Sequence, residues 1–72
     1  MADDYRKGKV IKKIRKFLGM NQQEFASSLN VKKRSTISNW ENDKAEPTLS
    51  LRQWEKLDSM LEERGKRMSD FE

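Results

Sequence analysis

The sequence predicts an all-α fold, a compact bundle of four to five short helices. Apolar residues recur at helical spacing in three separate stretches, and residues that start or end helices stand between those stretches. No segment alternates between apolar and polar residues as a half-buried strand would. Because 72 residues allow only a small core, we expect residues 1–72 to form a single domain.

The first helix is expected to run from about Tyr5 or Arg6 to Leu18. Gly8 weakens its first turn, because glycine costs about 1 kcal/mol relative to alanine inside a helix. Gly19 suits a left-handed C-terminal cap, and Met20 can then bury against the same core. The apolar stripe that predicts this helix consists of Val10, Ile11, Ile14, Phe17 and Leu18.

Two short helices joined by a tight turn are expected over about residues 22–41. Asn21 is a good N-cap for the first of them, and Glu24 stands where a capping box places its carboxylate. Asn30 can adopt the left-handed conformation that ends this helix. Val31 can bury its side chain in the core and so anchor the turn. The buried face of this helix is predicted to be Phe25, Ala26 and Leu29.

The second helix of the pair is predicted to bury Ile37 and Trp40. Its other face is short, polar and capable of hydrogen bonding, as required of a helix that lies in a DNA major groove. This outward face consists of Arg34, Ser35, Ser38 and Asn39.

A loop follows, because Asn42–Asp43 favours a turn and Pro47 cannot continue a preceding helix. We expect a longer helix over about residues 49–64, capped by Thr48 or Ser50 and ended near Gly65. Its apolar stripe is Leu51, Trp54, Leu57 and Leu61, with Met60 beside it. The tail, residues 66–72, holds Met68 and Phe71, which would pack back as a last helical turn, contact a second subunit, or remain without order.

Composition excludes several classes of protein. The chain has no cysteine and no histidine, so it lacks a disulfide framework, thiolate metal ligands and the commonest general base. We therefore predict no enzyme activity, no metal and no cofactor. The net charge of +4 is uneven: residues 1–44 hold eleven Lys and Arg against five Asp and Glu, whereas residues 45–72 hold five against seven. A basic half of this kind favours a polyanionic partner.

A set of positions within and around the two short helices carries a family resemblance: Gln22, Phe25, Ala26, Leu29, Val31, Thr36, Ile37, Ser38, Trp40, Glu41, Asn42 and Pro47. With these residues at this spacing, the sequence resembles the Cro/repressor-type (XRE) helix-turn-helix family. The resemblance covers about residues 10–61 and implies a lambda-repressor-like domain that binds double-stranded DNA. One departure lies in the turn, where four residues separate Val31 from Thr36 and the family usually has three.

The resemblance also implies roles for particular residues. Positions matching Arg34, Ser35 and Asn39 commonly contact bases in the family, and Ser38 shares their face. Arg15 and Glu41 would form a partly buried structural ion pair. We expect both tryptophans, Trp40 and Trp54, to belong to the core and not to stack on bases. Phosphate contacts are expected from Asn21, Gln22, Lys32, Lys33, Asn42 and Lys44.

The expected function is therefore that of a small transcriptional repressor, bacterial or phage-encoded and cytoplasmic. Proteins of this kind usually bind pseudo-palindromic sites as symmetric dimers. An alternative remains open, in which the same fold serves an antitoxin-like or cofactor protein as a module that binds another protein. No apolar run is long enough for a membrane span. The residues that could serve either a core or a homodimer interface are Leu57, Met60, Leu61, Met68 and Phe71.

Overall fold

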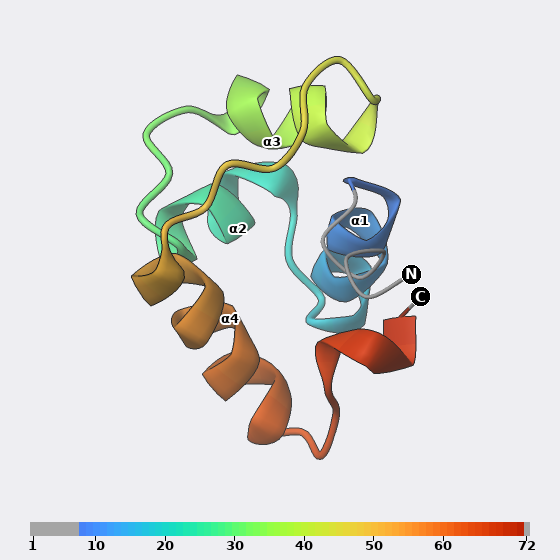
Figure 1. The fold of residues 1–72 in the computed structure, drawn as a ribbon. Coiled ribbons are helices and arrows are strands. Elements are labelled where there is room, and N and C mark those ends of the chain that lie inside the picture. The colour runs from blue at the N-terminus through green and yellow to red at the C-terminus, as the bar shows by residue number, and fades with distance from the viewer. Residues whose placement is uncertain (1–7, 72) are drawn as a thin grey trace.

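The computed structural model describes residues 8–71 and contains only helices and loops over that range. Four α-helices are followed by a short 3-10 helix (Figure 1). Their bounds are α1 Gly8–Phe17, α2 Gln22–Ser28, α3 Arg34–Glu41, α4 Leu51–Glu62 and η2 Met68–Phe71. The predicted all-α bundle is confirmed. The predicted start of the first helix at Tyr5 or Arg6 lies outside the described residues.

One apolar cluster holds the helices together. α1 and α2 both pack against α3, and η2 packs against α1. Trp40 and Trp54 are both buried, as predicted. The other buried apolar residues of the core are Val10, Ile11, Ile14, Leu18, Phe25, Ala26, Leu29, Ile37, Leu57, Leu61 and Met68.

Capping residues fix where the helices begin. At α2, the Glu24 backbone N–H donates to Asn21 Oδ1 (2.7 Å), and the Asn21 N–H donates to Glu24 Oε1 (2.8 Å), so the predicted capping box is confirmed. Ser50 and Gln53 form a second capping box at α4, which selects Ser50 over Thr48 as the cap. The left-handed conformation expected at Asn30 is also present, with φ of 59°.

The prediction that Leu51 belongs to the buried apolar stripe of α4 is wrong. Its side chain is 72% exposed, whereas Trp54, Leu57 and Leu61 are buried. At 100° per residue, Leu51 lies about 120° around the helix from Leu57, too far to share its face. Leu49, which precedes the helix, packs against the core instead.

The C-terminal tail packs back onto the domain. Met68 is buried, and the ring of Phe71 meets the ring of Phe17 edge-on with centroids 5.3 Å apart. Leu57 and Leu61 are fully buried in the same core. These two leucines and Met68 therefore serve the core, which corrects their inclusion in a possible dimer interface.

Gly8 lies where α1 meets the end of α3. A Cβ atom at this position would stand 1.7 Å from the backbone carbonyl oxygen of Trp40. The absence of a side chain is thus what lets the first turn of α1 approach α3 so closely. The sequence pattern indicates only that Gly8 weakens the first turn of the helix.

Candidate nucleic-acid interface

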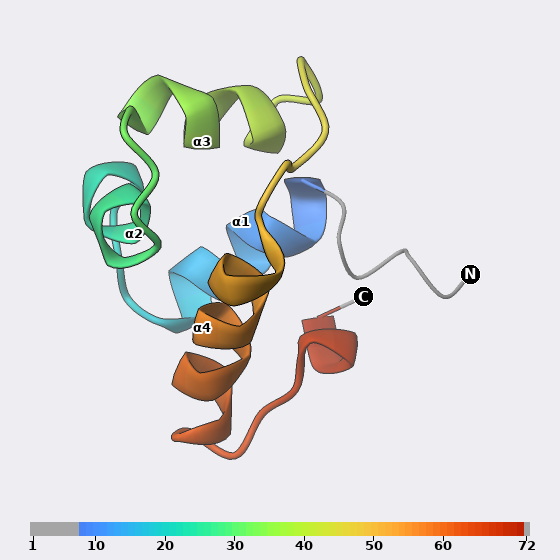
Figure 2. The same ribbon diagram turned by 60° about the vertical axis from the view of Figure 1, so that its left-hand side comes forward.

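The orientation of α3 follows from its two buried residues. Ile37 and Trp40 point into the core, so the opposite face of the helix meets solvent. α3 lies at one end of the molecule, and the C-terminal end of α4 lies at the other (Figures 1 and 2). The outward face holds the four predicted base-reading residues: Arg34, Ser35 and Asn39 are exposed, and Ser38 is half-buried. These four side chains are therefore brought together on one accessible surface.

Ser38 has a partner that the sequence did not suggest. The side-chain amide of Asn42 donates to Ser38 Oγ over 3.2 Å. The two residues are one helical turn apart, so this bond ties the C-cap of α3 to the middle of its outward face. Ser38 therefore presents its hydroxyl in a fixed position next to Asn39.

A polar network joins α1 and the start of α2 to the end of α3. Arg15 Nε donates to Glu41 Oε2 over 2.7 Å, and Arg15 Nη2 donates to Oε1 over 3.1 Å. The Glu41 side chain is only 2% exposed, and that of Arg15 is 12% exposed. Arg15 Nη1 also donates to the carbonyl oxygen of Met20 (2.9 Å). This ion pair links α1, the start of α2 and the end of α3.

Gln22 extends the network to the surface. Its Nε2 donates to Glu41 Oε1 over 3.1 Å, and its Oε1 accepts from Arg34 Nη1 over 3.5 Å. The sequence indicated a phosphate contact for Gln22 but gave no sign of these two bonds. Glu41 and Arg34 come within reach of Gln22 only because three helices meet here.

The lengthened turn between α2 and α3 is anchored at its start. The Val31 backbone N–H donates to the carbonyl oxygen of Ala26 over 2.8 Å, and Val31 packs against the core. Lys32 and Lys33 follow, and both are exposed. Lys33 is the N-cap of α3, and its side chain makes no capping hydrogen bond. The turn therefore ends in a basic N-cap whose side chain makes no capping hydrogen bond.

A second loop, which carries Lys44 as its one cation, follows α3. Asp43 adopts a φ of 60°, and the Lys44 backbone N–H then donates to the carbonyl oxygen of Asn39 over 2.8 Å. Asn42 and Lys44 are exposed. Exposed cations therefore stand at both ends of α3, Lys32 and Lys33 at its start and Lys44 beyond its end.

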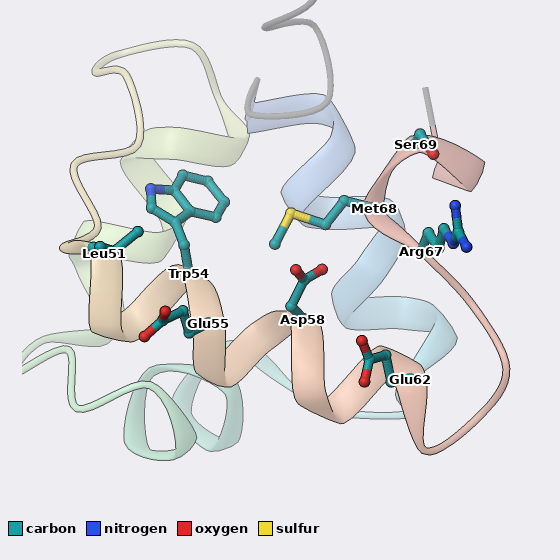
Figure 3. A pocket seen from close by; sticks show the side chains of 8 residues that line it. All are labelled: Leu51, Trp54, Glu55, Asp58, Glu62, Arg67, Met68 and Ser69. Carbon is teal, nitrogen blue, oxygen red and sulfur yellow. The ribbon is translucent and has the colours of Figure 1, made fainter.

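Two surface hollows differ sharply in charge. One lies beside the start of α3 and is lined by Arg15, Asn21, Gln22, Gln23 and Arg34. The other lies between α4 and the C-terminal segment, where Asp58 and Met68 point toward the space between them (Figure 3). Three carboxylates and one arginine line this second hollow: Glu55, Asp58, Glu62 and Arg67. Only the first hollow suits a polyanion.

Two other kinds of site are absent from residues 8–71. No cluster of acidic side chains there has the arrangement of a metal site. None of the described helices is long and apolar enough to cross a membrane.

Comparison with known protein families decides the identity of the domain. The helix-turn-helix family matches residues 11–56, which is more than half of the chain. The chain belongs to the Cro/repressor-type helix-turn-helix family. The matched part of this helix-turn-helix domain includes α2 and α3 with the turn between them, together with most of α1 and the first half of α4. Comparisons with curated proteins and with solved structures give no match.

Membership of this family gives the domain its general role, that of a DNA-binding regulator. The family is regulatory and not typically enzymatic.

Proposed function

We propose that this helix-turn-helix domain is a transcriptional repressor that recognises a specific double-stranded DNA site through α3. The observation that supports the proposal best is the accessible polar face of α3, held outward by the burial of Ile37 and Trp40. An α-helix of this kind fits the major groove, where each base pair presents a distinct set of donors and acceptors.

Two residues of this face have the chemistry for base recognition. The Arg34 guanidinium can donate two hydrogen bonds to O6 and N7 of a guanine, and the Asn39 amide can pair with N6 and N7 of an adenine. Ser35 and Ser38 would contact either bases or the adjacent backbone. Because one such helix spans only a few base pairs, recognition of an operator calls for two copies of the domain.

The flanking residues would hold the DNA backbone. Lys32 and Lys33 lie before α3 and Lys44 lies after it, so the three cations would neutralise phosphates on both sides of the groove. Asn42 would donate from the same loop as Lys44. Asn21 and Gln22 would meet the backbone at the start of α2, although the Asn21 side-chain oxygen already caps the helix.

A symmetric dimer would use apolar surface that the core leaves partly exposed. Met60 and Phe71 are half-buried, and they are the two members of the predicted interface set that remain accessible. Two domains related by a two-fold axis would then place their α3 helices one turn of DNA apart, on the two halves of a pseudo-palindrome. Occupying such a site would repress transcription by excluding the polymerase.

Selection from a randomised duplex library tests the proposal. The protein is incubated with the library, and the bound pool is sequenced after several rounds. We expect an inverted repeat of two short half-sites to be enriched. A pool without any enriched motif would overturn the proposal and would favour the alternative in which the domain binds another protein.

A further inference from the structure

We propose that the acidic hollow between α4 and the C-terminal segment is a docking groove for another protein, and that it receives a short peptide segment that combines lysines or arginines with one large apolar side chain. Three apolar side chains, three carboxylates, one arginine and one serine line this docking groove (Figure 3). None of them belongs to α3 or to the loops beside it, so the inference does not depend on what α3 binds.

The apolar end of the docking groove is formed by Leu51, Trp54 and Met68. A single exposed leucine is ordinary on a protein surface. Leu51 differs because its side chain, 72% exposed, lines the same hollow as Trp54 and Met68, which are almost wholly buried. An apolar side chain placed there would cover Leu51 and the edges of the other two. Removing this apolar surface from water favours binding.

The acidic part of the docking groove continues along the same face of α4. At 100° per residue, Glu55, Asp58 and Glu62 all fall within about 60° of one another and of Leu51. All three carboxylates are exposed. Apolar and acidic side chains thus form one continuous strip on the helix.

The exposed cations of α4 do not neutralise this strip. Arg52 and Lys56 lie on the adjacent face of the helix, where they line a different hollow that α4 shares with the end of α2. On the opposite wall of the docking groove, Arg67 is the one cation. The groove therefore carries a net negative charge, although the chain as a whole is basic.

The three carboxylates lack partners of their own. Among the residues that the structure describes, none of them forms an ion pair or accepts a hydrogen bond. Asp58 follows Glu55 by three positions and precedes Glu62 by four, and like charges at these helical spacings repel. A positively charged partner would relieve that repulsion, so the strip is complementary to lysine and arginine side chains.

The shape of the docking groove favours a peptide segment over a small molecule. The hollow has a volume of about 440 Å³. From Leu51 to Glu62, the strip extends roughly 16 Å along α4, at 1.5 Å per residue. About five residues of extended chain cover that length. The matching segment places its apolar side chain at Leu51 and its cations along the rest of the strip, whereas the carboxylates repel nucleic acid.

The experiment selects short random peptides displayed on phage against the full chain, at about 0.15 M salt to screen weak charge contacts. Enriched peptides are then synthesised with a fluorescent label, and anisotropy measures their dissociation constants. Asp58→Lys tests the acidic strip. Glu63→Lys is its matched control, because it changes the net charge equally, and Glu63 is exposed and lies outside the groove.

We expect the enriched peptides to share several lysines or arginines and one large apolar residue. Asp58→Lys should weaken their binding by roughly fivefold, as for the loss of one exposed ion pair, whereas Glu63→Lys should change it little. Leu51→Ala should weaken binding as well. Replacing the apolar residue of the peptide by serine should then cause no further loss in the Leu51→Ala protein, because the two side chains form one contact.

Thermal unfolding separates docking from folding. Asp58→Lys places a cation between Glu55 and Glu62, so its unfolding midpoint should be no lower than that of the parent protein. A lower midpoint would show that the Asp58 carboxylate serves the fold, and it would contradict the inference.

Four binding results would overturn the inference. They are a selection without enriched peptides, enrichment of acidic peptides alone, and equal binding of the enriched peptides to Asp58→Lys and to the parent protein. The fourth is loss of peptide binding as the protein concentration rises, which would identify a second copy of this chain as the occupant of the groove.

Discussion

At the scale of single residues, Glu41 connects the fold to the proposed interface. It is one of the last residues of α3, and it holds both Arg15 from α1 and Gln22 from α2. Removing its charge would leave the Arg15 guanidinium in a largely desolvated position without a counter-ion. Breaking one partner of such a pair costs more than the pair itself contributes to stability.

We therefore predict that Glu41→Ala lowers the free energy of unfolding by about 3 kcal/mol. Exposed Glu46 provides the control, because Glu46→Ala should change stability by less than about 0.5 kcal/mol. Urea unfolding followed by tryptophan fluorescence measures both variants. A loss for Glu41→Ala as small as that for Glu46→Ala would show that the pair behaves as a solvated surface contact.

At this scale, the sequence predicted the helix caps but not the partners of Gln22. Asn21, Glu24, Asn30 and Gly19 adopt the expected caps and backbone conformations, because those features depend on residues a few positions apart. The bonds from Gln22 to Glu41 and to Arg34 span 19 and 12 positions, and they depend on how three helices pack. The sequence pattern within each helix carries no information on how the three helices pack together.

At the scale of elements, the contact between α1 and α3 decides how α3 is held. Gly8 provides this contact, since its missing Cβ leaves room for the Trp40 carbonyl. In sequence, a glycine near the start of a helix indicates only a weak first turn. The approach of a backbone from residue 40 is a tertiary effect, and sequence reasoning could not detect it.

Gly8→Ala should accordingly destabilise the domain by about 1–3 kcal/mol, as overpacking does, although alanine is the better helix former. Lys12→Ala, an exposed change on the same helix, is the control and should have little effect. Thermal and urea unfolding compare the two variants. An increase in stability for Gly8→Ala would contradict the close approach of α1 to α3.

At the start of α3, we predict a substitution that increases the stability of the domain. α2 and α4 each begin with a capping box, whereas Lys33 provides no side-chain cap for α3. Lys33→Ser should therefore raise the free energy of unfolding by about 0.5–1 kcal/mol. Lys32→Ser, one residue before the cap, should give no comparable gain. Equal effects of the two substitutions in urea unfolding would argue against Lys33 as the cap.

The start of α4 shows how precisely a sequence pattern can place a helix boundary. The C-terminal helix was expected from about residue 49 but begins at Leu51, which is exposed. Near the start of a helix, a leucine can face either the core or solvent. The position of the N-cap residue decides which of the two it faces. Ser50 takes that role, so Leu49 turns toward the core and Leu51 turns outward.

At the scale of the whole molecule, the fold decides which exposed charges lie beside α3. Exposed cations flank α3, whereas α4 carries the exposed carboxylates Glu55, Asp58 and Glu62 together with two exposed cations, Arg52 and Lys56 (Figures 2 and 3). This arrangement would orient the domain as it approaches DNA, with α3 leading. The uneven charge of the two halves was visible in the sequence, but the position of Lys32, Lys33 and Lys44 on the two sides of α3 required the fold.

We predict that binding weakens linearly with the logarithm of salt concentration. Lys32→Ala and Lys44→Ala should each reduce the log–log slope by about 0.9, because each variant would neutralise one phosphate fewer. Lys56→Ala on α4 should leave the slope unchanged. Fluorescence anisotropy with a labelled duplex, repeated at several salt concentrations, provides the slopes. Equal effects of all three substitutions would mean that no particular face meets the DNA.

The most direct test of the central claim, that α3 presents its outward face to DNA, is an NMR titration of ¹⁵N-labelled protein with the selected duplex. We expect the largest amide and side-chain shift changes at Arg34, Ser35, Ser38 and Asn39 and in the flanking loops. Residues 55–62 of α4 should show little change. Shift changes concentrated on α4, with those of α3 unaffected, would contradict the claim.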